Sequence, residues 1–295
     1  MKLKLEGIWT PIPTPLTKDG RIDEGATRKL VDFHIEAGID GLLPLGTSGE
    51  FALLSREERA ALVSTVVDQV KHRVPVVAGV SDPSIENVIQ LSADAKKAGA
   101  DAVLATPPYY FTTGDEGHYL HFKTISESID LPLMIYNIPE WTHSFVTPET
   151  VQRLADEKLV VGMKYTENNL LNLIRFLKRS RTKMSILTGS DALAYANLEF
   201  GGSGAIMGTA NVAPRVASEI FDNHRKGNLA GAKQAQEKLL PIIDAFAIGK
   251  YPAALKEAMS LIGVPVGPLK KPLTALSTGE KKAVAALLRS GGFLD

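Results

Sequence analysis

The chain has 295 residues, and its 33 Lys and Arg are balanced by 33 Asp and Glu, which gives a formal charge of zero at neutral pH. Proteins that bind nucleic acid usually carry a basic surplus, so this balance argues against such a partner. The absence of cysteine excludes disulfides, thiolate nucleophiles and cysteine-ligated metals. The hydrophobic share of 44% is typical of a globular protein.

The N-terminal segment, residues 1–7, has no apolar stretch of signal-peptide length. Apolar runs elsewhere, such as residues 159–163, have the length of strands and are too short to span a bilayer. We therefore expect a soluble, cytoplasmic protein with no membrane partner.

About eight short apolar runs recur along the first two-thirds of the chain. They lie at residues 8–12, 41–45, 74–79, 102–106, 133–136, 159–164, 184–187 and 204–207. Most are apolar on both faces, which is typical of parallel strands that helices cover on both sides.

Segments with helical periodicity lie between these runs. One extends from Asp23 to Ala37 and another from Ser84 to Ala98. A third opens at Ser55 with a capping-box pattern, and a fourth opens at Thr147 with Pro148 just inside it. Strand and helix thus alternate roughly every 28 residues, and eight such units are typical of a (β/α)₈ barrel.

The strand signal stops after Pro214, and only helical segments follow. They lie at residues 216–226, 229–246, 252–261 and 278–288. We predict that the first closes a catalytic barrel over residues 1–227. The others would form a helical C-terminal region over residues 228–295 that packs against the barrel.

Lys164 is the strongest candidate for chemistry. It ends the apolar run 159–163, so its amine would emerge at the C-terminal end of a buried strand, where the catalytic groups of a barrel lie. Apolar surroundings penalise the ammonium form and favour a free amine that can attack a carbonyl. The alternative is a lysine that extends toward solvent and pairs with a carboxylate.

Two further motifs lie at the ends of predicted strands. Tyr136 ends the run 133–136, and a phenol beside a Schiff-base lysine can pass protons to and from a substrate. The alternative is a core tyrosine with a satisfied hydroxyl. Residues 46–50, Gly-Thr-Ser-Gly-Glu, place two hydroxyls between glycines, which suits either a small carboxylate or an ordinary turn that caps the next helix.

Other features indicate structure rather than chemistry. The glycines at 201–204 lack the dinucleotide-binding spacing and predict a helix stop followed by a tight turn. His118 and His121 share a helical face without a third metal ligand nearby, so we interpret them as part of a partly exposed surface and expect no metal site. Lys256 and Glu257 are interpreted as solvated helix surface.

Taken together, the motifs resemble the dihydrodipicolinate synthase/N-acetylneuraminate lyase family of class I pyruvate-dependent aldolases and lyases. The resemblance covers essentially the whole chain and rests on the segments Gly46–Glu50, Thr106–Tyr110, Tyr136–Pro139, Gly162–Lys164 and Gly208–Asn211. It implies a (β/α)₈ barrel with a helical C-terminal part, commonly a homotetramer, that needs no metal or organic cofactor.

The resemblance also implies roles for particular residues. Lys164 would form the Schiff base with pyruvate or another 2-oxo acid, Tyr136 would be the acid/base group, and Thr47 with Ser48 would hold the carboxylate. The remaining residues that it assigns to the site are Gly46, the carbonyl of Ile206, and Tyr110, which would reach into a neighbouring subunit's proton relay. An iminium at C2 accepts electrons, so C3 can lose a proton or the C3–C4 bond can break.

The subfamily is indicated by departures from two patterns. Synthases of this family carry an arginine two residues after the proline of the Tyr-Asn-x-Pro motif, where this chain has Trp141, and a neutral indole cannot clamp a carboxylate as arginine does. The sialic acid lyase pattern is broken at Ala192 and Gly208. The chain then resembles 2-keto-3-deoxy sugar-acid aldolases, with Thr166 and the segment Gly189–Asp191 available to bind sugar hydroxyls.

The leading hypothesis is therefore reversible cleavage of a 2-keto-3-deoxy sugar acid, such as 2-keto-3-deoxygluconate, to pyruvate and an aldehyde. The alternative enzymes are dihydrodipicolinate synthase, which condenses pyruvate with aspartate semialdehyde, and a keto-deoxy sugar-acid dehydratase. Two further alternatives are a phosphate-binding barrel enzyme and a silent barrel that binds a small 2-oxo acid.

Overall fold

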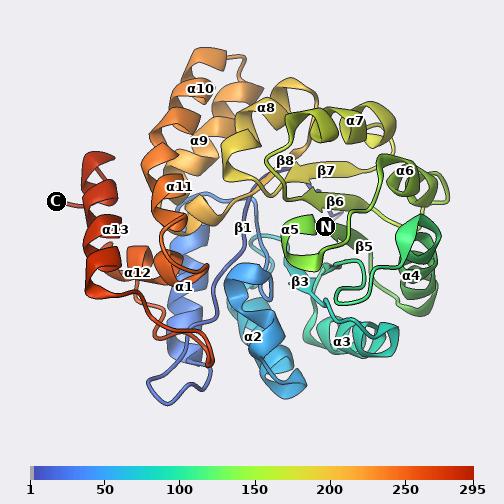
Figure 1. The fold of residues 1–295 in the computed structure, drawn as a ribbon, viewed down its shortest axis with the longest axis horizontal. Helices are drawn as coiled ribbons and strands as arrows, with labels where there is room; N and C mark the ends of the chain where they lie inside the picture. The colour runs from blue at the N-terminus through green and yellow to red at the C-terminus, as the bar shows by residue number, and fades with distance from the viewer. Residues whose placement is uncertain (1–2) are drawn as a thin grey trace.

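The apolar runs of the sequence form eight parallel strands in a computed structural model that describes residues 3–295 (Figure 1). They are β1 (Gly7–Thr10), β2 (Gly41–Leu42), β3 (Val77–Gly79), β4 (Ala102–Ala105), β5 (Leu133–Asn137), β6 (Gly162–Tyr165), β7 (Ser185–Thr188) and β8 (Gly204–Ile206). Neighbouring strands follow the order β2-β1-β8-β7-β6-β5-β4-β3, and a parallel bridge from Leu42 to Val76 joins the two ends. The predicted (β/α)₈ barrel is confirmed.

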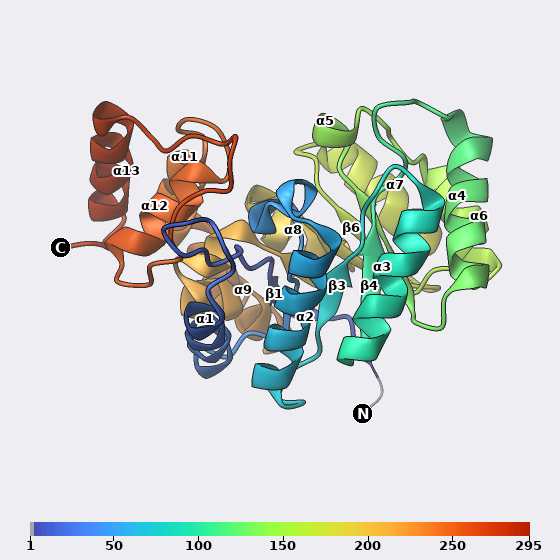
Figure 2. The ribbon, with the colours of Figure 1, turned by 90° about the horizontal axis from the view of Figure 1, so that it is seen from below.

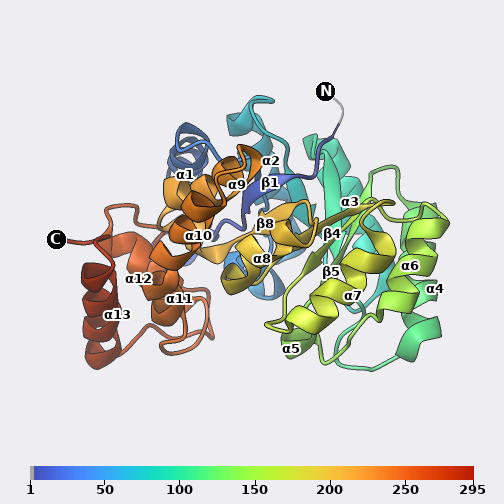
Figure 3. The same ribbon diagram turned by 90° about the horizontal axis from the view of Figure 1, so that it is seen from above.

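Helices surround this barrel in all three views (Figures 1, 2 and 3). They are α1 (Glu24–Glu36), α2 (Arg56–Val70), α3 (Ile85–Ala98), α4 (Gly114–Ser128), the single turn α5 (Pro139–Thr142), α6 (Pro148–Asp156), α7 (Leu170–Ser180), α8 (Ala194–Glu199) and α9 (Pro214–Arg225). Several begin as the sequence predicts, because a side chain accepts a hydrogen bond from the first turn. Asp23 and Thr147 accept from backbone N–H groups, and Ser55 completes a capping box with Glu58.

The strands are buried on both faces, as their composition predicts. Inside the barrel, the side chains of Trp9, Leu43, Leu104, Met134 and Leu187 form one apolar cluster. A larger apolar cluster fills the space between the strands and the surrounding helices. The barrel is therefore a packed core, and space for a ligand exists only toward its ends.

Four helices follow α9, and the last three, α11 to α13, stand together beside the barrel in Figures 1 and 2. They are α10 (Leu229–Lys238), α11 (Leu240–Phe246), α12 (Ala253–Leu261) and α13 (Thr278–Ser290). The predicted continuous helix over residues 229–246 is wrong, because it divides at Leu239. Pro241 has no N–H to continue the hydrogen-bond ladder. Within residues 3–295, no helix is long and apolar enough to cross a lipid bilayer.

A buried ion pair joins these C-terminal helices to the barrel. The Lys256 ammonium on α12 lies 2.6 Å from Oε1 of Glu50, and both side chains are almost fully buried. The ammonium also donates hydrogen bonds to the carbonyls of Thr14, at 2.9 Å, and Pro268, at 2.8 Å. The other oxygen of Glu50 accepts from the backbone N–H of Lys270, at 2.6 Å. The interpretation of Lys256 as solvated surface is wrong, because its partners come from distant segments of the sequence.

We predict that Lys256→Met destabilises the protein by about 3–5 kcal/mol, because it leaves the buried Glu50 carboxylate without its counter-ion. Chemical denaturation measures this change in the free energy of unfolding. The matched control is Lys281→Met, which removes a half-exposed ammonium 2.9 Å from Glu257 and should cost under about 1 kcal/mol. Equal losses of unfolding free energy in the two variants would contradict the prediction that the buried ion pair of Lys256 is the costlier one to break.

His34 on α1 provides a second buried titratable group, and burial lowers its pKa from 6.5 to about 3. The unfolded chain therefore binds this proton at a higher pH than the folded chain does. The contribution of neutral His34 to the free energy of unfolding is complete above about pH 6.5 and is lost as the pH falls toward 3. This free energy falls by at most about 1.4 kcal/mol per pH unit on that account.

We predict that His34→Gln removes this part of the pH dependence. The slope of unfolding free energy against pH, measured by denaturation between pH 4 and 6, should become shallower by up to about 1.4 kcal/mol per pH unit. The exposed His72 supplies the control, His72→Gln, which should leave the slope unchanged. An unchanged slope in His34→Gln would contradict the prediction.

Candidate active site

The pairing of β5 and β6 brings the two main candidate side chains together. Tyr136 and Lys164 are direct partners in the parallel ladder, so their side chains leave the sheet on the same face. The Lys164 amine lies 3.2 Å from the Tyr136 hydroxyl and 4.3 Å from the centre of its ring. Both residues are buried, at 4% and 2% exposure. The structure thus joins an amine that can attack a carbonyl to a phenol that can move its protons.

The loop after β2 extends this contact into a chain of polar groups. Thr47 and Ser48 lie in a short 3-10 turn, Thr47–Gly49. The Thr47 hydroxyl lies 3.1 Å from the Tyr136 hydroxyl, and the Ser48 hydroxyl lies 2.6 Å from that of Tyr251. Gly46 precedes the turn, and a Cβ there would lie 2.8 Å from the side chain of Leu43. The contacts through Tyr136 hold the turn close to the lysine.

Gly189, which follows β7, leaves room for the Lys164 side chain. A Cβ at this position would lie 2.7 Å from Cε of Lys164 and 1.9 Å from the Thr166 hydroxyl. That hydroxyl is buried and has no hydrogen-bond partner within residues 3–295. A buried polar atom without a partner is costly, so Thr166 is available to a ligand beside the lysine.

A cavity of about 360 Å³ surrounds these groups at the C-terminal end of the barrel. Its lining includes most of the predicted site: Thr47, Ser48, Tyr136, Trp141, Lys164, Thr166, Gly189, Asp191 and Ile206. Gly46 is not part of the lining, and its contribution is to the conformation of the turn. Among the described residues, Lys164 is the only basic one in the lining, whereas Glu140, Glu167 and Asp191 are acidic.

The Asp191 carboxylate is engaged with the loop after β8. It accepts hydrogen bonds from the backbone N–H and the hydroxyl of Thr209, at 2.7 and 2.6 Å, and from the N–H of Gly208, at 3.3 Å. Burial raises the pKa of this carboxyl, and the hydrogen bonds from Thr209 and Gly208 oppose the rise. Asp191 therefore lines the cavity, but its oxygens already hold that loop in place.

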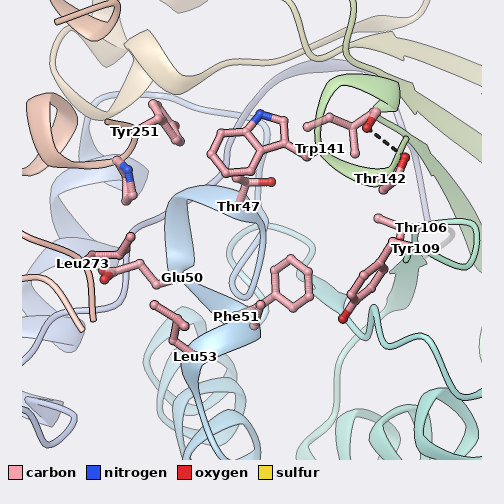
Figure 4. Close-up of a pocket in the computed structure, with 13 residues that line it drawn as sticks. Thr47, Glu50, Phe51, Leu53, Thr106, Tyr109, Trp141, Thr142, Tyr251 and Leu273 are labelled. Atoms are coloured by element: carbon pink, nitrogen blue, oxygen red, sulfur yellow. Dashed lines mark hydrogen bonds between the residues drawn. The ribbon is translucent and has the colours of Figure 1, made fainter. Parts of the chain in front are cut away.

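A second cavity of about 260 Å³ adjoins the first and is mostly apolar (Figure 4). The two share Thr47, Ile138, Trp141 and Tyr251 in their linings. Figure 4 shows the Trp141 ring beside Thr47, with Phe51 at the opposite wall. Trp141 is half exposed and meets Tyr251 edge to face, with 6.5 Å between the ring centres. It forms a wall between the polar and the apolar cavity.

Tyr110 lies apart from this site in its own chain. It is 87% exposed, it adopts a positive φ of 82°, and it meets Phe111 edge to face with ring centres 5.0 Å apart. Neither cavity that contains Thr47 includes Tyr110 in its lining. A role in proton transfer would therefore require a second copy of the chain.

Several lining residues were missed in the sequence analysis. Glu167 and Asn168 directly follow β6, and the rule that loops after barrel strands carry function could have identified them. Tyr251 and Phe246 come from the C-terminal helical segment, about 200 residues from the turn that Tyr251 contacts. No local pattern marks these two, since their place in the site depends on tertiary packing alone.

The histidines of α4 have a structural explanation. His118 and His121 are buried rather than partly exposed as predicted, because this face of α4 packs against the barrel. The His121 Nε2 lies 3.1 Å from the carbonyl oxygen of Thr106. In the described part of the chain, no cluster of three or more His, Asp or Glu side chains is placed to hold a metal ion.

Comparison with known proteins identifies the family of the chain. The model of the dihydrodipicolinate synthetase family matches residues 4–290. A 4-hydroxy-tetrahydrodipicolinate synthase of Thiobacillus denitrificans is 38% identical over 283 residues, which is 96% of each chain. A second enzyme of that name, from Thermodesulfovibrio yellowstonii, is 35% identical over 98% of this chain and 99% of its own.

Solved structures show the same relationship. YagE is a prophage protein of E. coli K12 that belongs to the dihydrodipicolinic acid synthase family, and its structure was solved in complex with pyruvate. It has a TM-score of 0.94 and 33% sequence identity, and the match covers 99% of this chain and 100% of its own. The dihydrodipicolinate synthase of Thermotoga maritima also has a TM-score of 0.94 and 33% sequence identity, and the match covers 98% of this chain and 99% of its own. The chain therefore belongs to the dihydrodipicolinate synthetase family and is a pyruvate-dependent, Schiff-base-forming enzyme of the aldolase and lyase class.

Proposed function

We propose that Lys164 forms the Schiff base with pyruvate. The observation that carries this proposal is the buried chain of contacts from Lys164 to Tyr136 to Thr47, at 3.2 and 3.1 Å. The amine attacks C2 of pyruvate, and the carbinolamine loses water to give an iminium, with Tyr136 moving the protons. The pyruvate iminium accepts the electron pair released when C3 loses a proton, and the iminium of a longer 2-keto acid accepts the pair released when its C3–C4 bond breaks.

In this proposal the hydroxyls of Thr47 and Ser48 hold the pyruvate carboxylate. They lie on one turn at the end of the barrel that contains the lysine, and both line the same cavity. Hydrogen bonds to a charged carboxylate are stronger than those between neutral groups, so two hydroxyls fix its orientation. C2 is thereby directed at the amine.

Two second substrates compete, and a different observation supports each. The names of the relatives favour dihydrodipicolinate synthase, which condenses pyruvate with aspartate semialdehyde, over the sugar-acid aldolase placed first in the sequence analysis. The cavity favours a neutral, hydroxylated aldehyde, because its lining contains no arginine and, in addition to Lys164, has several acidic side chains. On this geometry we propose cleavage of a 2-keto-3-deoxy sugar acid as the better reaction.

The test combines imine trapping with a panel of aldehydes. Borohydride reduction with pyruvate, followed by peptide mass spectrometry, should place a reduced pyruvyl adduct on Lys164. Lys164→Arg should lose the adduct, while Lys178→Arg, at an exposed position on α7, should retain it. Absence of an adduct in the unaltered enzyme, with pyruvate shown to bind, would contradict the Schiff base and favour a silent barrel.

The panel then separates the two reactions. We predict a kcat/KM for pyruvate with glyceraldehyde at least tenfold above that with aspartate semialdehyde, since opposing carboxylates in the cavity repel the second. Trp141→Arg should narrow this ratio by supplying a cation. A preference for aspartate semialdehyde in the unaltered enzyme would instead establish the synthase.

We also propose that the enzyme works as a homotetramer in which Tyr110 serves a neighbouring copy. The exposure of Tyr110 and Phe111, at 87% and 74%, supports this assignment. We predict that Tyr110→Phe lowers kcat by about 10- to 100-fold, because a proton-transfer group is lost, while the borohydride adduct on Lys164 still forms. Unchanged turnover would remove Tyr110 from the mechanism.

A further inference from the structure

Tyr251 enters the active site from outside the barrel. It precedes α12 in the C-terminal helical region, and its hydroxyl lies 2.6 Å from the Ser48 hydroxyl, 203 residues away in sequence. Its ring meets Trp141 and Phe246 edge to face, with ring centres 6.5 and 6.3 Å apart. These contacts hold the ring from two sides, so the hydroxyl has a fixed direction toward Ser48.

The phenol is the more acidic of the two hydroxyls, so we assign Tyr251 as the donor in this hydrogen bond. Within residues 3–295, the Tyr251 hydroxyl has one hydrogen-bonding partner, the Ser48 oxygen. Burial raises the pKa of Tyr251, so the phenol stays protonated and can donate. When Tyr251 donates to Ser48, the single proton of Ser48 is free to point into the cavity.

The adjacent hydroxyl is held in a parallel way from the other side. Thr47 contacts Tyr136, a residue of β5, whereas Ser48 contacts Tyr251, a residue of the C-terminal region. The Glu50–Lys256 ion pair fixes the same two segments relative to each other, because Glu50 follows the turn and Lys256 follows Tyr251. Two neighbouring hydroxyls are thus oriented by two tyrosines that separate parts of the chain supply.

We propose that Tyr251 is a positioning residue for the pyruvate carboxylate, acting through the Ser48 hydroxyl. This inference rests on the proposed Schiff-base reaction and adds that the C-terminal helical region completes the substrate site. Because the carboxylate is held equally before and during the reaction, loss of the Tyr251 hydroxyl weakens binding of pyruvate and leaves the chemical step largely unchanged.

The test is Tyr251→Phe, which keeps the ring contacts and removes the hydroxyl alone. The rate of borohydride trapping is measured against the concentration of pyruvate and of methyl pyruvate, an ester without the carboxylate charge. We expect the half-saturating concentration of pyruvate to rise about five- to tenfold, with the maximal rate within twofold and the values for methyl pyruvate unchanged. A matched control is Tyr119→Phe, which removes a hydroxyl 2.8 Å from Glu157 on the flank of the barrel. This control should leave the half-saturating concentration and the maximal rate unchanged for both ketones.

A second variant tests the route through Ser48. Ser48→Ala should raise the half-saturating pyruvate concentration, and adding Tyr251→Phe to it should have no further effect, since the hydroxyl to be oriented is already absent. Additive effects of the two substitutions would overturn the proposal. So would an unchanged pyruvate dependence in Tyr251→Phe, or equal losses with both ketones, which would show a structural role only. Absence of any adduct in the unaltered enzyme would instead overturn the Schiff-base proposal itself.

Discussion

The register between β5 and β6 is the constraint on which the site depends. Tyr136 pairs directly with Lys164, and a slip of one residue would turn one of the two side chains to the other face of the sheet. Both strands are buried on both faces, so a shift of either strand would disrupt the close packing of its side chains against their neighbours. The packing that stabilises the barrel therefore also fixes the 3.2 Å contact between amine and phenol.

One part of the site comes from outside the barrel. The C-terminal helical region supplies Tyr251 and one half of the buried Glu50–Lys256 ion pair, and the other half follows the turn that carries Thr47 and Ser48. A buried pair of charges contributes little net stability, but it is costly to separate. Its consequence here is geometric, because it holds the C-terminal region against the segment that follows the hydroxyl-bearing turn.

Sequence patterns predicted the barrel, because strands, helix starts and loop positions are local signals, and the family resemblance added part of the cavity lining, such as Thr47, Ser48 and Ile206. Lys164 and Tyr136 were found since each ends a buried run, and Ser55 was found through its capping box. Local patterns could not predict that Tyr251 enters the site, or that Lys256 and His118 are buried. Each depends on a partner far away in the sequence, and helical periodicity does not indicate which face another element will cover.

A crystal structure of the enzyme soaked with pyruvate would show the proposed Schiff base itself. We expect continuous density from the Lys164 amine to C2 of pyruvate, with the carboxylate within hydrogen-bond distance of the Thr47 and Ser48 hydroxyls and Tyr136 beside the new bond. Pyruvate bound with a free Lys164 side chain, or with its carboxylate directed away from the turn, would contradict it.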